Sequence, residues 1–185
     1  KEYLGRGVSY CATCDGAFFQ GYPVAVVGGG DSAVKEALYL ADIASRVYLI
    51  HRREGFRANQ TAVDKMLAND NIELKLNKVV KRIQGEGMMQ NLTLLDVKTG
   101  EEENLQVEGL FVSIGLVAAA DFIEGLLETE DGYIVTDKNM ATNYAGCFAA
   151  GDCTGRPYQY TKAVGEGNIA AHSCVSYLAA LGKAT

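Results

Sequence analysis

The stretch Tyr22-Pro23-Val24-Ala25-Val26-Val27-Gly28-Gly29-Gly30-Asp31-Ser32-Ala33 runs from apolar residues directly into three glycines. Four consecutive apolar residues predict a strand that is buried on both faces. In Gly28-x-Gly30-x-x-Ala33, the first glycine allows a tight turn and the second lets a pyrophosphate approach the backbone. The small third residue lets the next helix pack on the strand. The pattern is typical of a dinucleotide-binding turn; a glycine turn without a ligand is the alternative.

The residues after this turn favour the dinucleotide interpretation. Residues 32–42 predict a helix, because Ala33, Ala37 and Leu38 recur at helical spacing. Residues 46–50 predict a second strand. A strand, a glycine turn, a helix and a strand in this order form a βαβ unit, so we expect an α/β, Rossmann-like domain with a parallel sheet. The free N–H groups at the start of the helix suit a phosphate.

The rest of the chain adds strands of two kinds. Alternating residues at 78–84, 92–97 and 103–107 predict a three-stranded antiparallel meander, and 110–115 predicts another buried strand. Composition changes at 116–120, where three alanines follow one another, so we expect two domains, 1–115 and 116–185. Further expected elements are a helix at 58–68, strands at 72–76, 133–135 and 147–150, and a long helix at 163–181.

Basic residues at the end of the second strand indicate which dinucleotide binds. An NAD site places an acid about 20 residues after the turn, to bind the ribose 2′-hydroxyl. This sequence has His51, Arg52 and Arg53 there, with Arg57 following. Guanidinium groups bind a 2′-phosphate bidentately, whereas an acid repels it. We therefore predict NADPH over NADH; the alternative is a solvated basic patch.

Cys11 and Cys14 lie three positions apart, close to the glycine turn, and Asp15 follows directly. Three interpretations are open: a redox-active dithiol, half of a zinc site, or two structural thiols. The redox pair is favoured, because the only histidines are His51 and His172 and no second ligand pair has zinc spacing. Asp15 is either an acid/base for the leaving thiolate or a turn residue. The remaining cysteines, Cys147, Cys153 and Cys174, are expected to be packing thiols.

Bulk properties narrow the class of protein. The 185 residues carry a net charge of −6, with a pI near 5.0, which disfavours nucleic acid and anionic membranes as partners. No apolar run approaches the roughly 20 residues that span a bilayer. Five cysteines with one CxxC pair favour a cytoplasmic redox protein over a secreted disulfide framework. Because the chain begins Lys1-Glu2 without Met, we expect it to be a segment of a longer protein.

The C-terminal third carries weaker signals. Gly151-Asp152 follows an expected strand and presents a carboxylate to a ligand hydroxyl. Gly165-Glu166-Gly167 resembles the dinucleotide pattern, but no strand precedes it. We interpret it as a helix start that lets a flat, bulky group come close.

Taken together, five segments of the sequence resemble the low-molecular-weight thioredoxin reductases. They are Gly-Val-Ser-Tyr-Cys-Ala-Thr-Cys-Asp-Gly at 7–16, Val-Val-Gly-Gly-Gly-Asp-Ser-Ala at 26–33, His-Arg-Arg-Glu-Gly-Phe-Arg-Ala at 51–58, Gly-Leu-Phe-Val-Ser-Ile-Gly at 109–115, and Cys-Phe-Ala-Ala-Gly-Asp-Cys-Thr-Gly at 147–155. The resemblance implies an NADPH domain with a redox pair, followed by the C-terminal part of an FAD domain.

The resemblance also implies residue roles. Cys14 exchanges electrons with the flavin, Cys11 attacks the disulfide of a thioredoxin-like partner, and Asp15 is the nearby acid. The positions expected to contact NADPH are Gly28, Gly29, Gly30, Asp31, Ser32, Ala33, His51, Arg52, Arg53, Arg57, Ile114 and Gly115. The positions expected to contact FAD are Gly151, Asp152, Gln159, Tyr160 and Thr161. Because one domain carries both the nicotinamide and the dithiol, it is expected to rotate about linkers near 5–7 and 115–116, within a homodimer.

Two departures from that family bear on activity. The family begins with an FAD-binding βαβ unit, which is absent before Lys1, so this chain alone is not expected to hold FAD tightly. The family's polar, proline-containing stretch after Gly115 is replaced here by Leu116-Val117-Ala118-Ala119-Ala120. Two other functions stay open. One is the flavoprotein reductase of a peroxiredoxin or other disulfide carrier; the reductase of alkyl hydroperoxide systems, which the C-terminal segment also resembles, is disfavoured by His51-Arg52-Arg53. The other is a non-catalytic NADP(H)-binding module.

Overall fold

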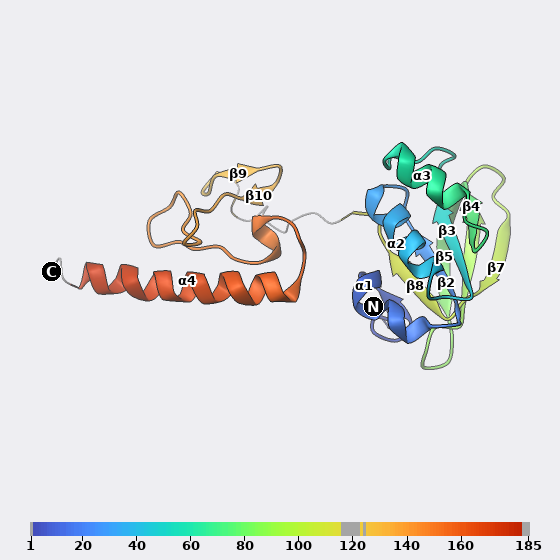
Figure 1. The fold of residues 1–185 in the computed structure, drawn as a ribbon, viewed down its shortest axis with the longest axis horizontal. Helices are drawn as coiled ribbons and strands as arrows, with labels where there is room; N and C mark the ends of the chain where they lie inside the picture. The colour runs from blue at the N-terminus through green and yellow to red at the C-terminus, as the bar shows by residue number, and fades with distance from the viewer. Residues whose placement is uncertain (1, 116–122, 124, 183–185) are drawn as a thin grey trace. The chain divides into compact units, whose positions relative to one another are not determined.

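The computed structural model describes residues 2–115, 123 and 125–182, and the chain divides into two compact units (Figure 1). Unit 1 is Lys1–Gly115 and unit 2 is Leu116–Thr185. The stretch 116–120, where the sequence predicts a domain boundary, lies outside the described residues. Each unit is described by itself.

Unit 1 is built on a five-stranded parallel sheet, as the βαβ pattern predicts. Its strand order is β1-β8-β2-β3-β4. The strands are β1 (Val8–Ser9), β2 (Pro23–Val27), β3 (Arg46–His51), β4 (Ile72–Leu76) and β8 (Gly109–Val112). From β2 the chain runs outward through β3 to β4, whereas β8 and β1 lie on the other side of β2. The order therefore reverses between β2 and β8.

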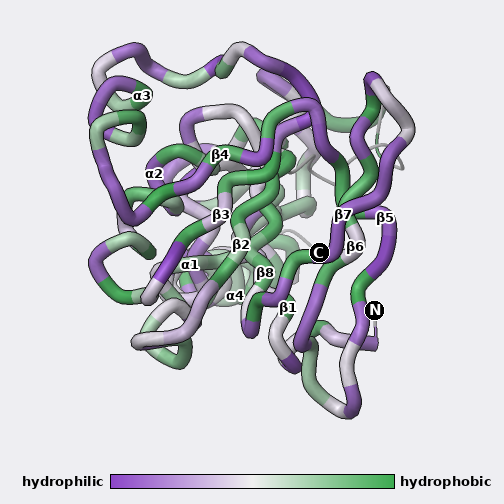
Figure 2. The backbone as a smooth tube through the Cα atoms, turned by 90° about the vertical axis from the view of Figure 1, so that its right-hand side faces the viewer, coloured by the Kyte–Doolittle hydropathy of each residue, from purple (hydrophilic) through white to green (hydrophobic). Residues whose placement is uncertain are grey.

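Two layers cover this sheet. Helices α2 (Asp31–Ala41) and α3 (Gln60–Leu67) bury one face, together with Val24 and Val26 of β2. The opposite face, with Ala25, packs on the meander β5 (Lys78–Gln84), β6 (Asn91–Asp96) and β7 (Glu102–Gln106). Alternate residues of β2 thus enter different cores, which explains its continuous apolar run. Figure 2 shows the hydrophobic strands β2, β3 and β8 between more polar outer segments.

The meander is an antiparallel sheet with the strand order β5-β6-β7, as the alternating sequence predicts. A charge network ties it to the parallel sheet. Lys75 Nζ of β4 lies 2.7 Å from Glu103 Oε1 of β7, and Lys78 Nζ lies 3.3 Å from Glu103 Oε2. The hydrogen bond from Lys75 is the main reason that the pKa of Glu103 lies below its usual value.

The cysteine segment forms two short helical pieces at the N-terminal end of unit 1. Helix α1 is Ala12–Asp15, and the 3₁₀ helix η1 is Gly16–Phe19. Ala12 is 1% exposed and joins the core beside α2, while a Cβ on Gly16 would lie 3.1 Å from Leu40 and Tyr39. Close packing on α2 therefore requires small residues on this side of the segment.

Unit 2 corrects two of the expectations. Its elements are β9 (Thr129–Glu130), β10 (Tyr133–Ile134), the 3₁₀ helix η3 (Asp152–Thr154) and α4 (Tyr160–Leu181). The strand expected at 147–150 is wrong: a single bridge joins Ala141 to Phe148, because the described residues supply no longer partner strand. The helix start expected at Gly165 is also wrong, since α4 begins at Tyr160. A Cβ on Gly165 or Gly167 would meet no atom within 4 Å, so no neighbouring group requires glycine at either position. Within a helix, each glycine lowers the helix stability by about 1 kcal/mol relative to alanine.

Within residues 2–115, 123 and 125–182, no helix is both long enough and apolar enough to cross a membrane.

Candidate functional site

The glycine turn lies where the strand order reverses, at the carboxyl ends of β2 and β8. Ligands of open α/β sheets bind at such a switch point. A Cβ on Gly28, whose φ is +153°, would approach within 2.3 Å of the Ser113 carbonyl oxygen and 2.7 Å of Ala33 Cβ. Gly30 caps α2 without a side-chain hydrogen bond, so the first N–H groups of the helix remain available to an anion.

The loop after β3 folds back over this turn. The N–H of Arg57 donates to the Gly29 carbonyl at 2.7 Å, and the N–H of Asn59 donates to Asp31 Oδ1 at 2.8 Å. A Cβ on Gly29 would lie 2.1 Å from the His51 ring, which stacks on Phe56 with its centroid 5.4 Å away. A side chain at Gly29 would have to displace the His51 ring, and this packing holds the basic loop beside the glycine turn.

The predicted basic residues are gathered at this edge. Arg52, Arg53 and Arg57 are exposed, while His51 is half-buried and its Nε2 lies 3.1 Å from the Gly55 carbonyl oxygen. Burial is the largest cause of a lowered His51 pKa, and the three arginines lower it further. Ser32 is half-buried at the start of α2, and Ile114 and Gly115 are exposed just after β8. The orphan helix N–H groups and the exposed guanidinium groups fit a dinucleotide with an extra phosphate.

The two cysteines of α1 form a disulfide, with their Cα atoms 5.3 Å apart. Cys14 is exposed and Cys11 is half-buried, so both sulfurs lie at the surface of unit 1. Cys11 also caps the short helix, because its Sγ accepts a hydrogen bond from the Cys14 N–H at 3.2 Å. The pair is accessible to another thiol.

Two polar residues that the sequence analysis missed make hydrogen bonds to the predicted site residues or to their direct neighbours. Ser9 is 5% exposed, and its Oγ donates to Asp15 Oδ2 at 2.7 Å while it accepts from the Cys11 N–H at 3.0 Å. Glu36 of α2 accepts a hydrogen bond from Ser113 Oγ, next to the predicted site residue Ile114. Burial raises the pKa of Glu36, and the hydrogen bond from Ser113 opposes the rise. The position of Ser9, two residues before Cys11, is the only sequence feature that could have indicated its role. No sequence feature indicates a role for Glu36.

In unit 2, the predicted flavin residues lie in one turn and at the start of α4. Gly151 has φ +90°, and its N–H donates to Glu166 Oε2 at 2.8 Å. Lys162 Nζ contacts the Gly151 carbonyl at 2.7 Å and Glu166 Oε2 at 3.0 Å, which fixes the turn on the helix. Asp152, Tyr160 and Thr161 are exposed and Gln159 is half-buried. An exposed carboxylate on a fixed turn fits one end of a polyhydroxylated ligand.

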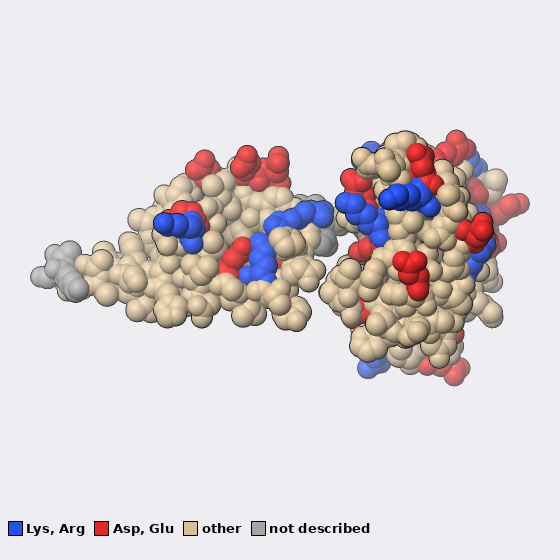
Figure 3. Space-filling model, viewed as in Figure 1, with Lys and Arg blue, Asp and Glu red and all other residues tan. Residues whose placement is uncertain are grey.

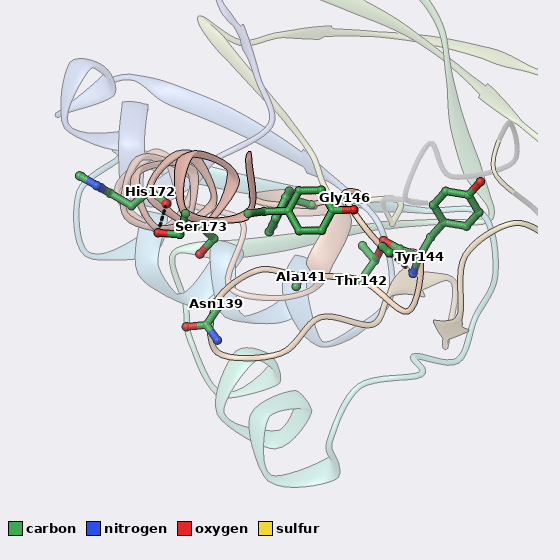
Figure 4. A pocket seen from close by; sticks show the side chains of 11 residues that line it. Asn139, Ala141, Thr142, Tyr144, Gly146, His172 and Ser173 are labelled. Carbon is green, nitrogen blue, oxygen red and sulfur yellow. Dashed lines mark hydrogen bonds between the residues drawn. The ribbon is translucent and has the colours of Figure 1, made fainter. Parts of the chain in front are cut away.

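Unit 2 also has a cleft of about 510 Å³ between α4 and the loop 139–148 (Figure 4). Its lining includes Tyr144, Phe148, His172 and Tyr177, and none of the predicted site residues. His172 is exposed and its ring points away from the other labelled side chains. Sequence and structure therefore give this cleft no convergent catalytic groups.

Comparison with known proteins adds independent findings. Residues 1–167 match the family model described as pyridine nucleotide-disulphide oxidoreductase. The chain is 45% identical over 181 residues to the thioredoxin reductase of Bacillus subtilis (strain 168), covering 96% of this chain and 57% of that protein. It is 44% identical over 194 aligned positions to the glucosaminate ammonia-lyase of Pseudomonas fluorescens, covering all of this chain and 61% of that protein.

Among solved structures, the fold is similar to thioredoxin reductase from Streptococcus pyogenes MGAS5005. The TM-score is 0.89 at 41% identity, covering 97% of this chain and 60% of that one. The chain thus spans about three-fifths of the length of the relatives that it matches. The α/β fold with its parallel sheet and meander is confirmed.

Proposed function

The chain belongs to the pyridine nucleotide-disulphide oxidoreductase family, and on this premise we propose that it is the disulfide-bearing part of an NADPH-dependent thioredoxin reductase. The single observation that carries the proposal is the surface disulfide Cys11–Cys14 in the same unit as the glycine turn and its basic loop. A relative's name alone is a weaker guide, because one similar protein is called an ammonia-lyase.

The proposed roles follow from the placement of the residues. The turn Gly28–Ala33 and the α2 N-terminus hold the pyrophosphate of NADPH. His51, Arg52, Arg53 and Arg57 hold its 2′-phosphate, and Ile114 and Gly115 are further cofactor contacts. Gly151, Asp152 and residues 159–161 hold part of FAD, with the rest supplied by other parts of a longer protein. When bound, the two cofactors supply hydride transfer and a carrier of two electrons.

Thiol–disulfide exchange then requires only this chain's sulfurs and a partner disulfide. Reduction adds two electrons and two protons to Cys11–Cys14. The Cys11 thiolate attacks one sulfur of the partner, forming a mixed disulfide, and Cys14 displaces the partner as a dithiol while the Cys11–Cys14 bond closes again. Asp15, held by the Ser9 hydroxyl, takes and returns a proton as thiolates form and leave.

The surface beside the disulfide supports a protein partner. Tyr10 and Phe18 flank the pair and are 56% and 80% exposed. Exposed aromatic side chains near a reactive group are typical of protein interfaces. A thioredoxin-like protein is the proposed partner, and a peroxiredoxin-type carrier is the alternative. The proposed location is the cytoplasm, because redox-active dithiols persist in reducing compartments. The proposal also includes a homodimer, as the family resemblance implies.

The proposed domain rotation must account for bonds at residues 3–8. The Arg6 carbonyl accepts from the Met89 N–H at 2.9 Å, and the Gly7 carbonyl accepts from the Leu110 N–H at 2.8 Å. Gly7 is buried, and a Cβ there would lie 2.6 Å from Met89 Cβ. A hinge at 5–7 has to break these contacts, and the second linker includes Leu116, outside the described residues.

The test is reductase activity of the complete protein that contains this chain. NADPH oxidation is followed with thioredoxin, with a peroxiredoxin-type carrier and with neither, in the parent and in Cys11→Ser and Cys14→Ser variants. We expect turnover with thioredoxin that both substitutions abolish. Turnover that survives both substitutions would show that the disulfide is structural, and binding of NADPH by a colourless complete protein would favour the non-catalytic module.

A further inference from the structure

The hydrogen-bond donors beside the Cys11–Cys14 disulfide point at only one of its two sulfurs. Cys11 Sγ accepts a hydrogen bond from the Cys14 N–H at 3.2 Å, and Thr13 Oγ1 lies 3.4 Å from the same sulfur. Among the residues that the structure describes, none donates a hydrogen bond to Cys14 Sγ. The surroundings of the pair therefore distinguish the two sulfurs, and they favour negative charge on Cys11.

The chemistry of a disulfide fixes the direction of the Thr13 hydrogen bond. Neither sulfur of a disulfide carries a proton, so the Thr13 hydroxyl is the donor and Cys11 Sγ is the acceptor. An uncharged sulfur is a weak acceptor. A hydrogen bond to a charged acceptor is roughly twice as strong as one to a neutral acceptor. The Thr13 hydroxyl thus stabilises a Cys11 thiolate more than it stabilises the disulfide.

Exposure indicates which sulfur an incoming thiolate reaches. Cys14 is exposed, whereas Cys11 is half-buried. Attack on Cys14 Sγ forms a new S–S bond to Cys14, breaks the Cys11–Cys14 bond and leaves the bonding electron pair on Cys11 Sγ. The leaving thiolate is then the sulfur that faces both donors. A leaving thiolate that is better stabilised makes thiol–disulfide exchange faster.

We propose that Thr13 is a further catalytic residue of the redox pair, whose hydroxyl donates to Cys11 Sγ and stabilises the thiolate that forms when the disulfide opens. The inference rests on the proposed redox role of Cys11 and Cys14. The contact acts in both directions of the exchange. It stabilises Cys11 as the leaving thiolate during reduction, and it stabilises the Cys11 thiolate before this sulfur attacks a partner disulfide.

The experiment measures how fast dithiothreitol opens the disulfide of the 185-residue chain. Samples are quenched with acid, labelled with a maleimide and analysed by mass. One thiolate of dithiothreitol attacks Cys14, the other displaces the Cys14 thiolate as the cyclic disulfide closes, and both cysteines take up protons. Thr13→Val has a similar shape but lacks the hydroxyl, so it should slow the opening about two- to fivefold. Thr13→Ser keeps the hydroxyl and should restore the parent rate.

A thiol that cannot form a cyclic disulfide shows which sulfur is attacked. After a brief reaction with glutathione and the same quench, we expect glutathione on Cys14 and the maleimide on Cys11. The reverse pattern would make Cys14 the leaving thiolate and would overturn this inference.

Thr61→Val is the matched control, because Thr61 is an exposed threonine of α3 outside the disulfide segment, and it should keep the parent rate. Thr13 is exposed as well, so its substitution leaves the buried cores unchanged. A Thr13→Val rate equal to the parent rate overturns this inference, as does a Thr13→Ser rate as slow as that of Thr13→Val. Both results leave the proposed function intact, whereas a parent disulfide that no dithiothreitol concentration opens overturns both.

Discussion

Units 1 and 2 differ most in how much apolar side chain each buries. Of the described hydrophobic residues that are buried, all except Ile134 and Ala149 belong to unit 1. The 22-residue helix α4 of unit 2 buries none of its residues, and Val164, Val175 and Leu178 are each at least 60% exposed. Unit 1 is thus stabilised by two apolar cores, and unit 2 chiefly by local polar contacts.

The surfaces show the same contrast. On the face of unit 1 in Figure 3, acidic and basic side chains are interspersed, whereas long stretches of unit 2 carry neither charge. Helix α4 also exposes the large hydrophobic side chains Val164, Val175 and Leu178, and proteins rarely leave large apolar faces in contact with water. The proposed NADPH-binding edge of unit 1 therefore lies on a unit with two apolar cores, whereas the proposed flavin residues lie on a unit that buries few apolar side chains.

The largest effect should come from separating the units. Residues 1–115 alone are expected to unfold cooperatively in urea, because both of their cores lie within that range. Residues 116–185 alone are expected to show no cooperative transition. Circular dichroism during urea titration measures both, and a cooperative transition in the 116–185 fragment would contradict the comparison.

A matched pair of leucines sharpens the comparison within the 185-residue chain. Leu49 of β3 is fully buried, so Leu49→Ala should lower the free energy of unfolding of unit 1 by about 2–5 kcal/mol. Leu178 of α4 is 60% exposed, and Leu178→Ala should change the free energy of unfolding by about 0.5 kcal/mol or less. Urea midpoints give both values, and equal losses at the two sites would be the opposite of what we expect.

The basic loop tests whether stability and binding are separate within unit 1. Arg52→Glu with Arg53→Glu should weaken NADPH binding at least about tenfold, since each lost charge-assisted hydrogen bond is worth about 1.5–3 kcal/mol. Both side chains are exposed, so the urea midpoint should stay close to that of the parent. Calorimetric titration with NADPH and with NADH measures the preference between the two dinucleotides, and Lys65→Glu on α3 is the control. An unchanged NADPH/NADH preference in the double variant would refute the 2′-phosphate role of the two arginines.

The smallest effect concerns pH. The pKa of Glu103 is lowered, first by the hydrogen bond from Lys75, so ionised Glu103 favours the folded state. Its contribution to the free energy of unfolding is fully present when the pH is above 4.5, the ordinary pKa of glutamate. It is lost as the pH falls through the lower pKa that Glu103 has in the folded state. Glu103→Gln should therefore make the loss of stability below pH 4.5 less steep, as thermal melts at several pH values will show. An identical slope in the variant would mean that the network contributes nothing measurable.

The sequence predicts unit 1 well because its signals are local. The run Val24–Val27 and the glycines after it specify strand, turn and helix within a few residues, and the basic loop follows by chain order. Contacts between distant residues leave no such pattern: Glu36 and Ser113 are 77 positions apart, and nothing in either segment signals their hydrogen bond.

Unit 2 was harder to predict for a physical reason as well. The apolar residues 147–150 have strand-like composition, but a strand needs a neighbour, and the described residues offer only the bridge at Ala141. The glycines of α4 indicated a helix start, whereas the open space around them lets the helix pass straight through. The domain division and the assigned site roles remain predictions for experiment.

The most direct test follows Cys11 and Cys14 in the complete protein during anaerobic addition of NADPH. Free thiols are alkylated before and after the addition, and the labelled positions are identified by mass. We expect both cysteines to become labelled with NADPH, and neither to do so when Arg52 and Arg53 are replaced by glutamate. A Cys11–Cys14 bond that stays closed while the protein binds both NADPH and flavin would contradict the account.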